Sequence, residues 1–211
     1  MPSRRPVMRL FCRILTAMRN DPWLAKWLDL IEKKSAGGWV LELGCGSGWD
    51  TVDLLAAGCK VTAMDISRER AAECALSAKG ADILQTDISK PLPVAKGGAA
   101  VIIASLSLHY FSWAVTLQIA SEIRRCIKAD GLLLARFNSL NDRHHGAGST
   151  LEIEPNFYSV GTGTKRFFDE DSVRLFLQGW DIQFLEENVI DRYRKPKYVW
   201  EAMAVCDCDP S

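Results

Sequence analysis

Apolar residues along this chain fall into short runs that are separated by segments of helical periodicity. The runs have the length of buried strands and cover residues 39–43, 60–64, 81–85, 99–105 and 132–138. The segments around them predict helices at residues 23–34, 49–57, 67–79, 113–128 and 168–179. Strands that alternate with helices in this way indicate an α/β protein with a parallel sheet.

Two further runs near the end of the chain predict strands at residues 180–190 and 197–206, joined by a charged turn. A turn of this length favours an antiparallel pair. The expected fold is therefore a doubly wound, seven-stranded, mostly parallel sheet with a C-terminal antiparallel hairpin. Residues 139–165 are rich in Gly, Asn, His and Ser, and they are predicted to form a long functional or mobile loop.

A glycine-rich loop follows the first predicted strand. Gly44, Gly46 and Gly48 occupy alternate positions, and the next helix begins near Trp49. Glycines allow a tight turn and let a ligand lie against the main chain, close to the free N–H groups of a helix start. Asp65 ends the second strand about 20 residues further on, where a carboxylate can bind both hydroxyls of a ribose. The loop and Asp65 together predict a site for an adenosine-type cofactor.

The glycine spacing distinguishes two classes of cofactor. Dinucleotide sites carry G-x-G-x-x-G, whereas this chain has G-x-G-x-G, and Trp49 takes the place of the third dinucleotide glycine. Glu42 lies two residues before the loop, where an acid disfavours a polyanion and suits a cation. E-x-G-x-G-x-G followed by Asp65 resembles the first motifs of class I S-adenosylmethionine-dependent methyltransferases. The resemblance implies a Rossmann-like methyltransferase domain at residues 37–206 that binds S-adenosyl-L-methionine.

The resemblance also implies individual cofactor contacts. Ile66 is expected on one face of the adenine, Asp87 at its amino group with Ile88 packed nearby, and Ser105 with Leu106 along the methionine part. Asp87 has a second interpretation as a helix cap or turn residue. The predicted cofactor set is Glu42, Gly44, Cys45, Gly46, Gly48, Asp65, Ile66, Asp87, Ile88 and Ser105.

The methyl acceptor is expected outside the carboxyl ends of the fourth and fifth strands. His109 and Tyr110 follow the fourth strand, and they are the candidate catalytic residues. His109 is either a general base or a helix-start residue bonded to the backbone. Adjacent His144 and His145 would point opposite ways in an extended loop, so no metal site is predicted. Trp49 and Asp50 are further candidates near the cofactor. Further candidates near the acceptor are Arg136, Asn138, Asp142, Glu152, Glu154, Asn156 and Tyr158.

The sequences of the segments after the fourth and fifth strands bear on the identity of the acceptor. Residues 136–148, 152–158 and 165–169 are similar to small bacterial methyltransferases of the tellurite-resistance type, which act on small molecules. Residues 105–109 read S-L-S-L-H, not the N-P-P-Y-type tetrapeptide of amino-methyltransferases, which counts against base-flipping chemistry. Methyl transfer to a small-molecule nucleophile is the favoured function. A nicotinamide-dependent oxidoreductase and a non-catalytic methyltransferase-like binding module remain alternatives.

Composition limits the partners and the compartment. The 211 residues include 26 basic and 26 acidic side chains, so no overall field attracts nucleic acid: DNA is not an expected partner and RNA is disfavoured. No apolar run has the length of a membrane span. The seven scattered cysteines favour a reducing cytoplasm over a disulfide framework. Residues 1–36, with a basic start, are predicted to form an N-terminal helical lid, and a homodimer is considered as an assembly.

Overall fold

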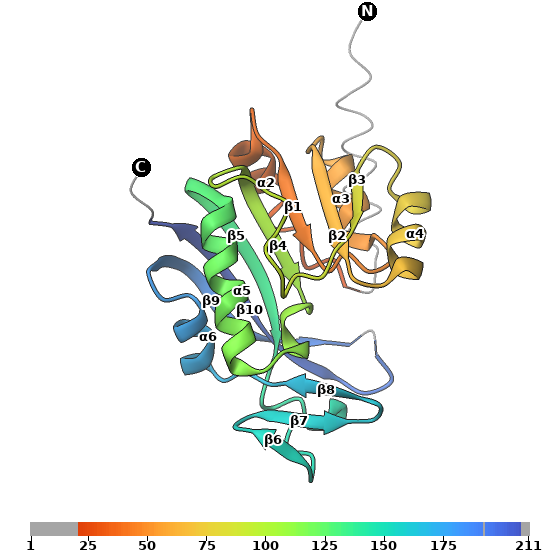
Figure 1. The fold of residues 1–211 in the computed structure, drawn as a ribbon, viewed down its shortest axis with the longest axis vertical. Coiled ribbons are helices and arrows are strands. Elements are labelled where there is room, and N and C mark those ends of the chain that lie inside the picture. The colour runs from red at the N-terminus through yellow and green to blue at the C-terminus, as the bar shows by residue number, and fades with distance from the viewer. Residues whose placement is uncertain (1–20, 192, 208–211) are drawn as a thin grey trace, which may run out of the picture.

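A computed structural model describes residues 21–191 and 193–207 of this protein. Its main sheet has seven strands in the order β3-β2-β1-β4-β5-β10-β9 (Figure 1). These strands are β1 (Val40–Leu43), β2 (Val61–Asp65), β3 (Asp82–Gln85), β4 (Ala99–Ser105), β5 (Ile127–Asn138), β9 (Trp180–Ile190) and β10 (Lys197–Cys206). The pairs among the first five are parallel, and β10 is antiparallel to both β5 and β9. The predicted fold class, including the C-terminal hairpin, is confirmed.

Helices cover both faces of this sheet. The helices are α2 (Leu28–Ser35), α3 (Trp49–Ala56), α4 (Arg68–Ser77), α5 (Trp113–Cys126) and α6 (Glu170–Phe176). Apolar residues of α5 and α6 belong to one core cluster, whereas those of α2, α3 and α4 belong to the cluster on the opposite face. Ser67 caps α4 and Asp169 caps α6 through side-chain bonds to backbone N–H groups, as the sequence predicts for both helix starts.

The segment predicted as a long loop contains a second sheet. Its antiparallel strands are β6 (Glu152–Glu154), β7 (Phe157–Val160) and β8 (Gly163–Arg166). In Figure 1 this sheet lies beyond the carboxyl ends of the parallel strands. The prediction of one long loop at residues 139–165 is wrong in that the segment contains strands, because two short turns, at Asn156 and Gly161, give these residues local partners; both have positive φ. Its functional or mobile character stays a prediction.

Two predicted boundaries also move. Helix α2 begins at Leu28 because residues 23–27 form turns and not a regular helix. Strand β5 begins at Ile127, directly after α5, because Ile127 pairs with Ala99 of β4. The residues just before the predicted strand at 132–138 therefore form an irregularity within β5, where Asp130 takes a φ of 56°.

The N-terminal lid is only partly within the described residues. Residues 1–20 lie outside them, and the lid stays a prediction for that segment. The described part, from Asp21 onward, packs on the sheet: Leu28 and Ile31 of α2 are buried in the core.

Cysteines are mostly buried thiols. Cys45, Cys59, Cys74 and Cys126 are free and buried. Cys206 is disulfide-bonded. The expectation of a reducing compartment stays a prediction. No helix among residues 21–191 and 193–207 is long and apolar enough to span a bilayer.

Candidate functional site

A cavity of about 710 Å³ opens at the carboxyl ends of β1, β2 and β4. The strand order reverses between β1 and β4, and ligands of open α/β sheets bind at such a switch point. The cavity lies between the loop after β1 and the segment after β4. Its lining includes most of the predicted cofactor residues, namely Glu42, Gly44, Cys45, Gly46, Asp65, Ile66 and Ser105, and the further candidates Trp49, Asp50 and Leu106.

The three glycines of the loop have different roles. A Cβ on Gly44 would lie 2.4 Å from Cβ of Ser107, and one on Gly48 would lie 2.8 Å from Sγ of Cys74. Both glycines are therefore required by packing, and Gly48 is also the cap of α3. A Cβ on Gly46 would meet nothing within 4 Å. The open space above Gly46 is the place where a ligand can lie against the main chain.

Asp65 is held at the tip of β2 by two backbone groups. Its Oδ2 accepts from the Gly46 N–H at 2.9 Å, and its Oδ1 accepts from the Ser67 N–H at 2.9 Å. Each carboxylate oxygen has a further lone pair for an outside donor. Asp65 therefore both fixes the glycine loop and faces the cavity, with the exposed side chain of Ile66 beside it.

Glu42 is a buried acid among other acids. Its Oε2 accepts from the Thr51 hydroxyl at 2.6 Å. Burial, followed by the charges of Asp50, Asp53 and Asp65, raises the pKa of Glu42 to about 8, and the Thr51 bond offsets only part of this. This end of the cavity, which we call the acidic end (Glu42, Asp50 and Asp65), therefore favours a cationic ligand group.

Asp87 and Ile88 do not line the cavity. The Asp87 carboxylate accepts from the backbone N–H and the hydroxyl of Ser89, at 2.9 and 2.7 Å. These bonds lower the pKa of Asp87 and make it a turn residue, in line with its second interpretation. Ile88 is buried in the core. Their contact with adenine stays a prediction.

Residues just before α2 bond to two residues of the cavity lining. The Trp23 indole N–H donates to both oxygens of Asp50, at 3.1 and 2.9 Å. Arg136 donates to both oxygens of Asp21, at 2.9 and 2.8 Å, and to the Ser105 hydroxyl. Its guanidinium also lies 4.4 Å from the Trp23 ring centre. The predicted candidates Asp50 and Arg136 are thus both cavity residues and anchors for the incoming chain.

His109 and Tyr110 belong to a short 3₁₀ helix, η1 (Leu108–Tyr110), and both line the cavity. Their rings are 4.1 Å apart. His109 is buried, and its Nδ1 has no hydrogen-bond partner among the described residues. Burial, Lys197 and Lys165 lower the pKa of His109 to about 3, so its imidazole is neutral. The interpretation of His109 as a residue bonded to backbone through Nδ1 finds no support in this part of the chain.

We expect the imidazole resonances of His109 to stay constant between about pH 5 and pH 8, where an unperturbed histidine titrates. The reason is its pKa of about 3 in the free protein. An NMR titration measures this, with the signals assigned by their loss in His109→Asn. A titration midpoint inside that pH range would contradict the buried, neutral state.

Other candidates from the loop region have structural partners. Glu152 accepts from the Asn156 N–H at 2.8 Å, and Tyr158 is buried between strands. Asp142 is fully buried and does not line the cavity. Asn138 is also buried away from it, and its amide atoms have no partner among the described residues. His145 lines the cavity, whereas exposed His144 does not.

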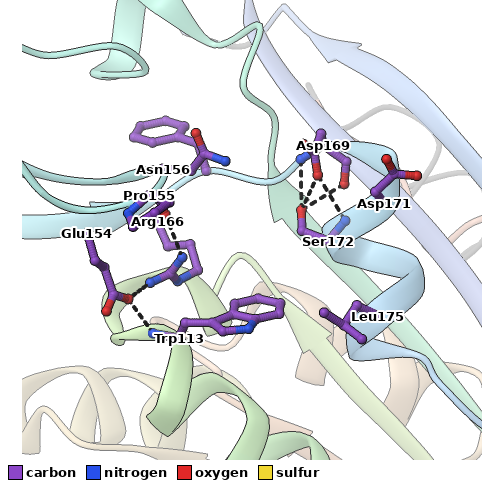
Figure 2. A pocket seen from close by; sticks show the side chains of 10 residues that line it. Trp113, Glu154, Pro155, Asn156, Arg166, Asp169, Asp171, Ser172 and Leu175 are labelled. Atoms are coloured by element: carbon purple, nitrogen blue, oxygen red, sulfur yellow. Dashed lines mark hydrogen bonds and ion pairs between the residues drawn. The ribbon is translucent and has the colours of Figure 1, made fainter.

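A second cavity, of about 490 Å³, lies where the small sheet meets α5 and α6 (Figure 2). Arg166 is buried at its wall, where it pairs with Glu154 and donates to the carbonyls of Phe111 and Pro155. Glu154 also accepts from the Trp113 N–H at the start of α5. Glu154, an acceptor-site candidate in the sequence, is therefore part of the clamp that holds the small sheet on the main body.

Several cavity residues were not among the candidates from the sequence. Ser47, Ser107 and Lys165 lie within segments that the sequence singled out, without being named as site residues. Arg70, Tyr193 and Lys197 are single residues from other segments that the fold brings to the cavity. The turn residues Asn156 and Gly161 are the one sequence signal for the small sheet that carries Lys165.

Comparison with known proteins bears on the same region. Residues 40–131, from β1 into β5, match the sequence profile of a family described as a methyltransferase domain. Among curated protein sequences none matches this chain.

Solved structures share the fold at low sequence identity. An S-adenosylmethionine-dependent methyltransferase from Mesorhizobium loti has a TM-score of 0.67 and 14% identity, and the match covers 90% of this chain and 99% of that one. The 1,6-didemethyltoxoflavin-N1-methyltransferase of Burkholderia thailandensis, with bound 1,6-didemethyltoxoflavin and S-adenosylhomocysteine, has a TM-score of 0.63 and 16% identity over 85% and 76% of the two chains. The magnesium protoporphyrin IX methyltransferase of Synechocystis, with bound S-adenosylhomocysteine, has a TM-score of 0.62 and 19% identity, and the match covers 86% of this chain and 83% of that one.

Proposed function

We propose that this protein transfers a methyl group from S-adenosyl-L-methionine to a small-molecule nucleophile. The observation that carries the proposal is the acidic end of the cavity beside an open glycine loop. Glu42, Asp50 and Asp65 line the same cavity as Gly46, whose exposed face leaves room for a ligand. The family match at residues 40–131 and the methyltransferase fold support S-adenosylmethionine as the cofactor.

The residues present fit such a cofactor. Asp65 has acceptor capacity left for ribose hydroxyls, and Ile66 offers an exposed apolar side chain beside it. The acidic end suits a sulfonium and an ammonium group, since both are cations. Ser107 Oγ is buried, lines the cavity and has no hydrogen-bond partner among the described residues. A bound ligand can supply that partner.

When bound, the cofactor would supply a methyl group from its sulfonium. The methyl carbon would bond to the acceptor atom, and the sulfur would keep the electron pair of the broken carbon–sulfur bond. The protein must hold the acceptor beside that methyl group and exclude water. Proximity and orientation alone can be worth about 7–11 kcal/mol. His109 is neutral and lines the cavity, so it can accept a proton there, but at a pKa of about 3 it is a weak base, and a bound anion must raise that pKa before it can act as a general base.

A small-molecule acceptor agrees with the size of the cavity, about 710 Å³, which is in the range of small-molecule sites. Two neighbours of the same fold are named for small-molecule substrates. The similarity of residues 136–148 to the tellurite-resistance type supports the same class. The N-terminal lid, a cytoplasmic location and a homodimer stay predictions that accompany this function.

Calorimetric titration with S-adenosylhomocysteine, with NAD as the paired control, tests the cofactor. Saturable binding of S-adenosylhomocysteine alone is the expected result. Binding of NAD alone would favour a nicotinamide-dependent oxidoreductase. Cofactor binding without methyl transfer to any acceptor would leave a non-catalytic binding module.

Replacing Asp65 with alanine is expected to weaken S-adenosylhomocysteine binding by about tenfold or more. Each charge-assisted hydrogen bond lost is worth about 1.5–3 kcal/mol, and the Gly46 N–H also loses its acceptor. Calorimetry on Asp65→Ala measures the effect. Asp82→Ala, an exposed acid at the start of the neighbouring strand β3, is the matched control. Equal affinities for the two variants would show that the ribose is not bound at Asp65.

A further inference from the structure

The part of the cavity beyond His109 carries positive charge. Lys165 from β8 and Lys197 from β10 both line it, and both act electrostatically on His109. Lys197 Nζ lies 2.9 Å from Asp142 Oδ2, so that ion pair is neutral overall. Asp142 also bonds to His145 Nδ1 at 2.6 Å. We call this group of Lys165, Lys197 and His145 the basic end of the cavity.

Lys165 has no carboxylate of its own at the basic end. Its Nζ donates to the His145 carbonyl at 3.4 Å, and no ion pair of Lys165 occurs among residues 21–191 and 193–207. Among the described residues that line the cavity, the acids are at the other end. Residues 1–20 contain five arginines and no Asp or Glu, so they supply no carboxylate side chain either. Burial, followed by the nearby Lys197, lowers the pKa of Lys165, and the opposing charges of Asp142 and Tyr193 offset only part of this.

An unpaired acceptor or donor lies beside these charges. His109 Nδ1 is buried and without a hydrogen-bond partner among the described residues. A buried polar atom without a partner is destabilising unless a ligand or water completes it. The ring of Tyr110 covers His109 at 4.1 Å, and Tyr193 interacts electrostatically with both Lys165 and Tyr110. Aromatic side chains therefore flank the basic end.

The cavity thus has opposite charges at its two ends. Tyr110 lies between them, since its hydroxyl interacts with Asp65 as well as with Tyr193. The acidic end fits the cationic cofactor of the proposed function. A second ligand group of opposite charge is needed to balance Lys165.

We propose that the methyl acceptor is a small organic anion whose carboxylate or phosphate binds between Lys165 and Lys197, beside His109. The inference rests on the proposed function and defines its substrate class. It also gives the small sheet a purpose, because β8 is the element that brings Lys165 over η1 and the cavity.

The test uses the full chain and methyl-labelled S-adenosylmethionine. A low-molecular-weight extract of bacterial cells is separated by ion exchange into anionic, neutral and cationic pools, and each pool is offered as acceptor. Transfer of the label to a compound of the anionic pool alone is expected. The active pool is then treated with alkaline phosphatase, which removes the phosphate of a phosphate acceptor and leaves a carboxylate acceptor intact. Loss of label transfer after the treatment identifies a phosphate acceptor.

Variants of Lys165 connect the charge to the site. Lys165→Met is expected to lower kcat/KM for the anionic acceptor by about tenfold or more, with S-adenosylhomocysteine affinity unchanged. Lys165→Arg keeps the charge and should retain most of the activity. Lys60→Met, an exposed lysine at the opposite end of the sheet, is the control and should match the wild type. Thermal unfolding of each variant verifies that it folds.

The outcomes separate the two levels of the proposal. Transfer of the label to the neutral or cationic pool would overturn the anionic substrate class but not methyl transfer itself. Equal activity of Lys165→Met and Lys60→Met would have the same meaning. If no pool yields labelled product while S-adenosylhomocysteine binds, methyl transfer to a small molecule is itself overturned, and the anionic class with it.

Discussion

Replacing Arg166 with methionine is expected to lower the free energy of unfolding by about 1.5–3 kcal/mol, the range of hydrogen bonds to charged groups, because it removes a buried guanidinium that pairs with a partly exposed carboxylate. Arg166 is only 3% exposed, and burial lowers its pKa to about 10. The substitution removes the Arg166 donor from the carbonyls of Phe111 and Pro155 and from Glu154, which keeps only the Trp113 N–H. Methionine keeps the apolar stem of the side chain, so the loss reports the guanidinium group.

Urea denaturation followed by circular dichroism measures this change. Arg174→Met is the matched control, because Arg174 is 52% exposed and pairs with Glu170 on the surface of α6. An exposed pair of this kind contributes about 0–1 kcal/mol. Similar losses for the two variants would mean that the Arg166 pair does not hold the small sheet on the main body.

The position of Arg166 also links stability to the site. It follows Lys165 directly, and successive residues of a strand point to opposite faces. Arg166 is therefore fixed in the clamp with Glu154, whereas Lys165 faces the cavity. Loosening the clamp is expected to reduce turnover of an anionic acceptor more than it reduces cofactor affinity, since the acidic end is built on other strands.

The parts of the fold that local sequence determines could be predicted. Strands β1 and β4 are apolar runs that the sheet buries on both faces. Ser67 and Asp169 mark helix starts because their side chains bond to the N–H groups of the first turn. The cofactor end was also predictable, since Gly44 and Asp65 belong to adjacent strand tips whose carboxyl ends meet at one edge.

The rest depends on contacts between distant segments. The small sheet was missed because β6 is three residues long and mostly exposed, so it shows no alternation of apolar and polar positions. Lys165 and Lys197 are single lysines that no motif marks, and they meet only because β8 ends and β10 begins at the same cavity. The burial of Glu42, which sets its pKa, likewise follows from tertiary packing.

Replacing Glu42 with glutamine is expected to stabilise the protein, and increasingly so as the pH rises. The pKa of Glu42 is raised from 4.5 to about 8 in the folded state, chiefly by burial and then by Asp50. Between these values the folded protein keeps a proton that the unfolded chain has released, so stability falls as the pH rises through this range. Above about pH 8 the full cost is present, on the order of 5 kcal/mol at about 1.36 kcal/mol for each pKa unit.

Glutamine removes this cost and can keep the bond from the Thr51 hydroxyl, because its amide oxygen also accepts. Urea denaturation of the wild type and Glu42→Gln at a series of pH values measures the difference. Glu186→Gln, an exposed acid on β9, is the control and should track the wild type throughout. A constant difference between Glu42→Gln and the wild type across the range would show that Glu42 is ionised in the free protein.

The same residue is expected to couple cofactor binding to proton release. A cation at the acidic end stabilises the ionised form of Glu42, so binding near pH 7 should release up to one proton. Calorimetry in buffers of different ionisation enthalpy counts the protons, and Glu42→Gln should release fewer. S-adenosylmethionine should release more than S-adenosylhomocysteine, because only the former carries a sulfonium. Equal proton release by both ligands would place the sulfonium away from Glu42 and leave the ammonium group as the cation that the acidic end binds.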